Sequence, residues 1–197
     1  MMNVFRNLVA TSMLLIIMPT CADEGDIFIN ISHGQSQVDS LFSRPTGSAR
    51  IERQDTGHNL TLGYQLTESF GIAGFYSDLG QTHVTGNSGD TFVSQGRVWA
   101  FQEDNSVITA DLLVWGIVAI YSNRTSSKSI ISSKIGWTQA DMRFNAGFSN
   151  FRDTGYSFGF VWSYVLVQDI HFVLDYQAYT LNTLTASLVS IGMRLVF

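Results

Sequence analysis

Apolar and polar residues alternate along much of this chain, most clearly in eight segments. Side chains of a β-strand point to opposite faces with a period of two residues, so each segment is predicted to be a strand. The residues between them are rich in Gly, Ser, Asn and Asp, which favour turns and loops. The predicted strands are Ile27–Gln37, Asn59–Leu66, Phe70–Tyr76, Val107–Tyr121, Ile130–Trp137, Tyr156–Leu166, Ile170–Thr180 and Ala186–Phe197.

One face of several predicted strands carries large apolar side chains only. In Tyr156–Leu166 the aromatic residues and Leu166 share a face, and in Ala186–Phe197 an apolar face opposes one with Ser190 and Arg194. Such faces promote aggregation in water, whereas acyl chains cover them in a bilayer. We therefore predict an all-β fold, an eight-stranded antiparallel up-and-down transmembrane β-barrel. A soluble lipocalin-like barrel would place the apolar faces inside, and alternation alone does not distinguish the two.

The connections between the predicted strands differ in length. Three are short, namely the turn after Leu66, Ser122–Lys128 and Gln168–Asp169. Three are long and polar, and a short loop surrounds Asn182. Because an even number of strands puts both chain ends on one side, the short turns are predicted to face the periplasm. The long loops, predicted to lie outside, are Val38–Thr56, Gln81–Asn105, for which its own hairpin is an option, and Thr138–Thr154.

The segment Gly63–Gly80 (GYQLTESFGIAGFYSDLG) combines Gly-Tyr, a polar turn, an alternating strand and Tyr-x-Asp-Leu-Gly. This pattern resembles the small outer-membrane barrels typified by the OmpA transmembrane domain and the OmpX/Ail-like proteins. The resemblance implies the outer membrane of a Gram-negative bacterium. It also implies that the terminal aromatic, Phe197, is the assembly signal recognised by the barrel-assembly machinery. Ala73 stands where many relatives carry a glutamate, which implies a smaller internal charge network.

The first 22 residues are predicted to be a secretory signal peptide. Arg6 precedes the short apolar core Leu8–Met18, and Thr20-Cys21-Ala22 supplies small residues for cleavage. The mature barrel domain is then 23–197, without cysteine. Lipidation at Cys21 is the alternative, although Met18-Pro19-Thr20 matches a lipoprotein signal poorly.

Composition excludes several kinds of function. The chain has 16 acidic and 11 basic residues, so nothing favours nucleic-acid binding. The four histidines are scattered and no mature cysteine is expected, so no metal site or other cofactor is predicted. No His-x-Ser element is present. A pair of His33 and His58 at the outer rim is conceivable, but catalysis, such as modification of lipid A, is not predicted.

An eight-stranded barrel is narrow enough for its own side chains to fill it. The ionisable residues expected inside are Lys134, Asp175 and Arg194, of which the first two occupy positions where the resemblance implies an interior lysine and acid. Buried charges must pair, so we expect them to close the lumen structurally. The alternative is a gated ion path.

A cluster of basic residues in the first long loop is the candidate binding surface. It comprises Arg44, Arg50 and Arg53, offset by Glu52 and Asp55. Guanidinium groups pair bidentately with phosphate, so this cluster is predicted to contact lipopolysaccharide or a host factor. The predicted function is therefore structural or surface-interacting, through loops held on a rigid scaffold. A narrow channel is the alternative, and a lipid A-modifying enzyme is less favoured.

Overall fold

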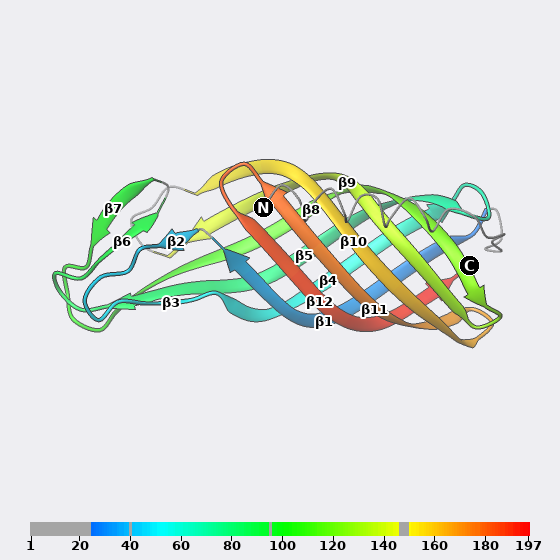
Figure 1. Cartoon of the computed structure of the whole chain (residues 1–197), viewed down its shortest axis with the longest axis horizontal. Helices are drawn as coiled ribbons and strands as arrows, with labels where there is room; N and C mark the ends of the chain where they lie inside the picture. The colour runs from blue at the N-terminus through cyan, green and yellow to red at the C-terminus, as the bar shows by residue number, and fades with distance from the viewer. Residues whose placement is uncertain (1–24, 40, 95, 146–149) are drawn as a thin grey trace, which may run out of the picture.

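Eight long antiparallel strands close into a barrel in the computed structural model, which describes residues 25–39, 41–94, 96–145 and 150–197 (Figure 1). Each barrel strand pairs with the next along the chain, and β1 pairs with β12 to complete the ring. A closed ring leaves no unpaired strand edge in a bilayer. The barrel strands are β1 (Ile27–Asp39), β4 (Gln54–Gln65), β5 (Phe70–Gly86), β8 (Ser106–Ser126), β9 (Ser129–Phe144), β10 (Phe151–Val167), β11 (Ile170–Leu181) and β12 (Thr185–Val196).

The first and last barrel strands meet along their whole length. Their register runs from Phe28 opposite Val196 to Asp39 opposite Thr185. The backbone amide of Phe197 donates to the carbonyl of Ile27 at 2.8 Å. Both strand ends therefore lie at the same end of the barrel, as the even strand count predicted. The described part of the chain contains no helix that could cross a membrane.

The predicted orientation of the faces is confirmed. Large apolar side chains cover the outside, where Tyr156 is 73% exposed and Ile135 68%. The inner face holds polar residues such as Asn30 and Thr61. An apolar exterior around a partly polar interior excludes the lipocalin-like alternative.

The strands are longer than predicted. A tilted strand needs about 9–11 residues to cross a bilayer, whereas β5 and β10 have 17 residues each and β8 has 21. The ladders of β5, β9 and β10 continue beyond the apolar band at the end that carries the long loops. β8 instead gains 122–126 at the short-turn end, so the predicted turn Ser122–Lys128 is wrong in extent and only 127–128 separate β8 from β9. The predicted loop 138–154 is also wrong in extent, because β9 runs to Phe144 and β10 begins at Phe151.

The other two predicted loops also contain strands. β3 (Arg50–Glu52) pairs with β5, and β2 (Phe42–Ser43) pairs with β6 (Thr91–Ser94). β6 continues into β7 (Arg97–Ala100), so the hairpin considered for 81–105 is present. These four short strands extend the barrel at its long-loop end, on the left of Figure 1.

Aromatic side chains fill the space beneath this extension. The Phe42 ring meets the Phe92 ring at 5.7 Å and the Phe144 ring at 6.3 Å, both edge to face. Phe92 also contacts Phe101 at 5.2 Å. Phe42, Phe92 and Phe101 belong to the same buried apolar cluster as Leu112 and Val114 of the barrel interior, and Phe144 packs against it. One core therefore runs from the lumen into the extension.

The predicted signal peptide, residues 1–22 with Cys21, lies outside the described residues, and its cleavage stays a prediction.

Candidate functional site

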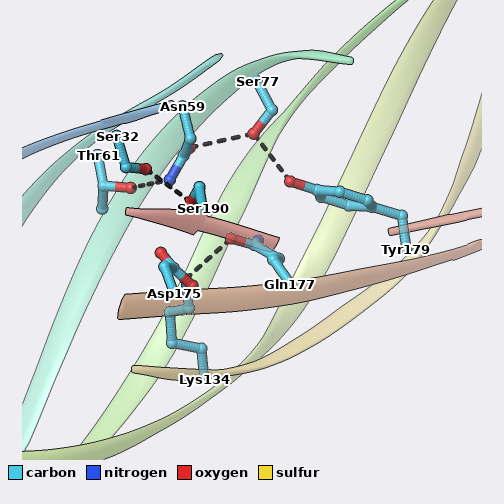
Figure 2. A network of polar contacts seen from close by, with 9 residues as sticks. All are labelled: Ser32, Asn59, Thr61, Ser77, Lys134, Asp175, Gln177, Tyr179 and Ser190. Carbon is cyan, nitrogen blue, oxygen red and sulfur yellow. Dashed lines mark hydrogen bonds and ion pairs between the residues drawn. The ribbon is translucent and has the colours of Figure 1, made fainter. Parts of the chain in front are cut away.

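The most buried charges of the barrel form an ion pair in the lumen. Lys134 on β9 donates from Nζ to the carboxylate oxygens of Asp175 on β11 at 2.7 and 2.8 Å, and to Oε1 of Gln177 at 2.9 Å (Figure 2). The side chains of Lys134 and Asp175 are only 4% and 3% exposed. The third contact occupies the remaining donor of the ammonium group, so its charge is compensated and its hydrogen bonds are complete.

A glycine makes this pair possible. Lys134 and Asp175 lie on strands that flank β10, and Gly159 of β10 is opposite both Lys134 and Gln177 in the ladders. A Cβ at Gly159 would lie 3.0 Å from Cε of Lys134 and 2.5 Å from the carbonyl oxygen of Tyr176. Because Gly159 has no side chain, it leaves space for the side chain of Lys134 to cross β10.

Arg194, the third predicted interior charge, points inward but forms no ion pair within the described residues. Its guanidinium carbon lies 4.5 Å from the centre of the Phe28 ring, a cation–π contact. Arg194 is opposite His171 on β11 and Asn30 on β1, near the short-turn end. The predicted three-charge group is therefore split into an ion pair and a separate cation.

A second polar chain crosses the lumen beside the ion pair. The hydroxyl groups of Ser77 and Tyr179 are 2.8 Å apart, and the Ser77 hydroxyl donates to Oδ1 of Asn59 at 3.0 Å (Figure 2). The Asn59 amide donates in turn to Thr61 at 3.2 Å. These bonds satisfy buried groups from β4, β5 and β11 with one another.

Apolar side chains occupy the rest of the interior. Leu112, Val114, Val118, Val161 and Val173 are each at most 2% exposed. They interrupt any continuous polar route between the two ends, and the aromatic cluster around Phe42 and Phe92 covers the long-loop end. The arrangement is a packed core.

The predicted basic cluster lies at the long-loop end. Arg44, Arg50 and Arg53 are all exposed, and Arg50 is fixed on β3 opposite Thr85. Arg53 lies 3.9 Å from an oxygen of Asp39, a weak exposed ion pair. Among the residues that the structure describes, Arg44 and Arg50 make no ion pair.

Hydrogen bonds tie this first long loop to its neighbours. The Thr46 amide donates to the carbonyl of Thr91 at 2.9 Å, and the Ser48 hydroxyl donates to the carboxylate of Asp90. Hydrogen bonds from the Ser48 hydroxyl and the Asn87 amide lower the pKa of Asp90, so the carboxylate is charged at neutral pH. The arginines therefore lie on a loop whose conformation is fixed by hydrogen bonds to its neighbours.

Two histidines that are distant in sequence meet on the outside of the barrel. His33 on β1 is directly opposite His58 on β4, with the two Nδ1 atoms 3.3 Å apart. The sequence suggested this pair only as an option, because a long connection separates the two strands and fixes no register. The alternation itself could have predicted their shared outward face, because His33 follows the outward residue Ile31 by two positions and His58 precedes the outward residue Leu60 by two.

Phe197 follows β12 at the short-turn end. Its side chain is 69% exposed on the outer surface, and its backbone carbonyl accepts a hydrogen bond from Ile27 at 3.2 Å. Its role as an assembly signal stays a prediction.

Comparison with solved structures finds small outer-membrane barrels. Ail of Yersinia pestis in complex with the heparin analogue sucrose octasulfate has a TM-score of 0.56 and 16% identity, over 89% of this chain and 100% of that one. OprG of Pseudomonas aeruginosa has a TM-score of 0.62 and 11% identity, over 90% and 98%. The N-terminal β-barrel domain of OprF from Pseudomonas aeruginosa has 0.55 and 11%, over 88% and 98%. At these identities the likeness shows the fold alone. No curated protein sequence matches the chain.

A closed antiparallel barrel with an apolar exterior defines the class of integral outer-membrane β-barrel proteins. The family model of the OmpA-like transmembrane domain matches residues 22–185. The chain belongs to this family, and its place is the cell outer membrane. The short-turn end accordingly faces the periplasm, and the end with β2, β3, β6 and β7 faces the exterior.

Proposed function

We propose that this protein binds polyanionic glycans at the cell surface, such as lipopolysaccharide phosphates or sulfated host polysaccharides, through Arg44, Arg50 and Arg53. The observation that carries the proposal is that Arg44 and Arg50 are exposed on a structured extracellular surface and form no ion pair with any residue that the structure describes. A guanidinium group in this state can give both of its donor edges to a phosphate or sulfate.

Two of the acidic residues nearby, Asp55 and Asp90, are occupied by other partners. The Asp55 carboxylate accepts from the backbone amides of Gln81 and Thr56, both at 2.7 Å, and Asp90 accepts from Ser48 and Asn87. These hydrogen bonds fix the two carboxylates within the loops, and neither carboxylate forms an ion pair with Arg44, Arg50 or Arg53. The solved complex of Ail with sucrose octasulfate gives a precedent for polyanion binding by a barrel of this fold.

The interior argues against transport as the main function. The Lys134–Asp175 pair and the apolar side chains around it fill the lumen, and a narrow channel would require several of them to move together. We keep a gated channel as the competing proposal. Catalysis is not part of the proposal: His33 and His58 face outward, and their Nδ1 atoms hydrogen-bond to each other. Unchanged lipid A mass spectra on overexpression would agree with this.

Binding of the refolded protein in nanodiscs to immobilised heparin, and to lipopolysaccharide micelles, tests the proposal. The variant Arg44→Asn/Arg50→Gln/Arg53→Gln removes the three charges. Asn is chosen at position 44 because Arg44 has a φ of 50°, a conformation that Asn tolerates. The matched control is Arg124→Gln/Lys128→Gln, which removes exposed charges at the periplasmic end.

We expect the triple variant to lose at least about tenfold in affinity, and wild-type binding to weaken at about 0.5 M salt. The control variant should bind like the wild type. Equal binding by the triple variant and the wild type would refute the proposal, as would equal losses in both variants, since these would reflect net charge alone.

A further inference from the structure

The outer surface of the barrel carries an imidazole pair of defined geometry. His33 and His58 are opposite each other in the β1–β4 ladder and both are exposed on the outward face. Their Nδ1 atoms are 3.3 Å apart, and their ring centres are 4.6 Å apart with the planes tilted by 37°. One Nδ1–H donates to the other Nδ1, so the Nδ1 atoms of the two rings face each other.

This separation matches the requirement for two ligands of a single metal ion. Zinc binds imidazole nitrogen at about 2.0–2.1 Å in tetrahedral geometry, which places two ligand nitrogens about 3.3 Å apart. Imidazole is also a preferred ligand of Cu²⁺ and Ni²⁺, whose square-planar sites place neighbouring nitrogens about 2.8 Å apart, so these ions require a small closure of the pair. A metal ion bound by both nitrogens would displace the proton of this hydrogen bond.

The backbone beneath the pair is tightly held. Gly34, next to His33, lies so close to β12 that an added Cβ would be 1.9 Å from the carbonyl oxygen of Val189. Gly34 is opposite Gly57, the neighbour of His58. Two histidines on adjacent, hydrogen-bonded strands lose little freedom on binding a metal ion, which favours chelation.

The pair sits where water and ions reach it. The outward residues just below it are apolar, Ile31 on β1 and Leu60 on β4, so the imidazoles mark the upper edge of the apolar band. Both line a surface groove of 490 Å³ together with Asp78, which is opposite His58 on β5. In the described residues no three His, Cys, Asp or Glu side chains are already arranged around one point. The two histidines therefore leave further coordination positions open to water or an interfacial anion.

We propose that His33 and His58 chelate a divalent transition-metal ion, Zn²⁺ in the first place, at the outer boundary of the bilayer. The site is independent of the polyanion surface. Its two ligands are the Nδ1 atoms, and Asp78 is the nearest described acid in the ladder to assist them.

Zinc titration of the chain without a polyhistidine tag, refolded in detergent, tests this proposal. A chromogenic chelator as competitor reports affinity and stoichiometry. The variants are His33→Gln, His58→Gln and the double variant, with His83→Gln as the matched control, since His83 bonds to Thr109 on another part of the barrel. A boiled and unboiled gel confirms that each variant is folded.

We expect one zinc ion per chain in the wild type. Each single variant should lose about a hundredfold in affinity, because the second imidazole no longer acts at high effective concentration. The double variant should be little worse than either single one, and His83→Gln should bind like the wild type. With Cu²⁺ as the probe, electron paramagnetic resonance should show two coordinated nitrogens.

Zinc binding that survives in the double variant would overturn the proposal, and so would its loss in His83→Gln. If the single variants were to fold poorly, a wild-type Cu²⁺ spectrum showing no pair of coordinated nitrogens would overturn it independently.

Discussion

Lys134 reaches Asp175 across a whole strand: its ammonium group lies 2.7 Å from the carboxylate, and β10 runs between the strands that carry the two residues. Both side chains are almost completely buried. Each charge therefore depends on its partner, because burial removes it from bulk water.

Replacing Lys134 with Met should be strongly destabilising. The change leaves the charge of Asp175 buried and uncompensated, and we expect the free energy of unfolding to fall by about 3–5 kcal/mol. Urea unfolding in lipid vesicles measures it. The double variant Lys134→Met/Asp175→Leu should recover most of the loss, since an apolar pair of similar volume carries no buried charge. Lys128→Met, in an exposed turn, should change little.

A methyl group at Gly159 should disturb the same pair from the strand between. Its Cβ would be 2.5 Å from the Tyr176 carbonyl oxygen, so the backbone must shift. We expect Gly159→Ala to lower the free energy of unfolding by about 1–3 kcal/mol. Gly74→Ala is the matched control, because the added Cβ there meets only the Gly116 carbonyl oxygen at 3.9 Å. Equal effects of the two substitutions would contradict this role for Gly159.

Asp153 clamps the loop between β11 and β12 at the extracellular rim. Its carboxylate accepts from the Thr183 amide at 2.7 Å and the Thr154 amide at 2.8 Å. Burial raises the pKa of Asp153, but hydrogen bonds from the Thr183 hydroxyl and amide and from Thr154 outweigh it, so the pKa lies below its usual range. The stability from this clamp is therefore present above the unfolded-state pKa of about 3.9 and is lost as pH falls through the lower folded-state value.

The amide chemical shift of Thr183 in detergent micelles should follow this titration. Its midpoint should lie below about pH 3.9, and Asp153→Asn should abolish the transition. Asp141→Asn, which affects only an exposed ion pair with Arg152, should leave the transition unchanged. A midpoint above pH 4 would show that burial dominates.

Substitution of Phe197 should affect assembly in cells more than stability. The ring is exposed, whereas the backbone bonds to Ile27 do not depend on the side chain. We propose that Phe197 is the assembly signal that the family resemblance implies, and on that proposal we expect Phe197→Ala to reduce the amount of folded barrel in the outer membrane several-fold. Refolding of the purified chain into detergent should proceed as in the wild type. Phe70→Ala, another exposed aromatic, should insert normally.

The alternation of apolar and polar residues predicted the parts of the strands that lie within the bilayer. Within the apolar band each outward side chain must be apolar. In segments such as Tyr156–Leu166 the alternation therefore predicts both the strand and the face that contacts lipid. Above the band water accepts polar side chains on the outer face, and the ladders continue there without that signal. The ends of β5, β9 and β10 were for this reason assigned to loops.

Contacts between strands were harder to predict than the strands. Alternation and the family resemblance predicted that Lys134 and Asp175 point inward. Their ion pair was harder to predict, because it depends on the space that Gly159 leaves between them. The contact between His33 and His58 depends on the register of β1 against β4, and the sequence did not predict that register because the two strands are joined by a long connection. The aromatic cluster around Phe42 and Phe92 comes from strands too short to show a period.

The lumen is a packed core, and we propose that the protein acts through its surface. Conductance of the refolded protein in planar lipid bilayers tests it most directly, with Lys134→Met/Asp175→Leu measured beside the wild type. We predict no steady conductance from either protein. Discrete openings of the wild type that change in size or frequency in the double variant would contradict the claim and would establish the ion pair as a gate.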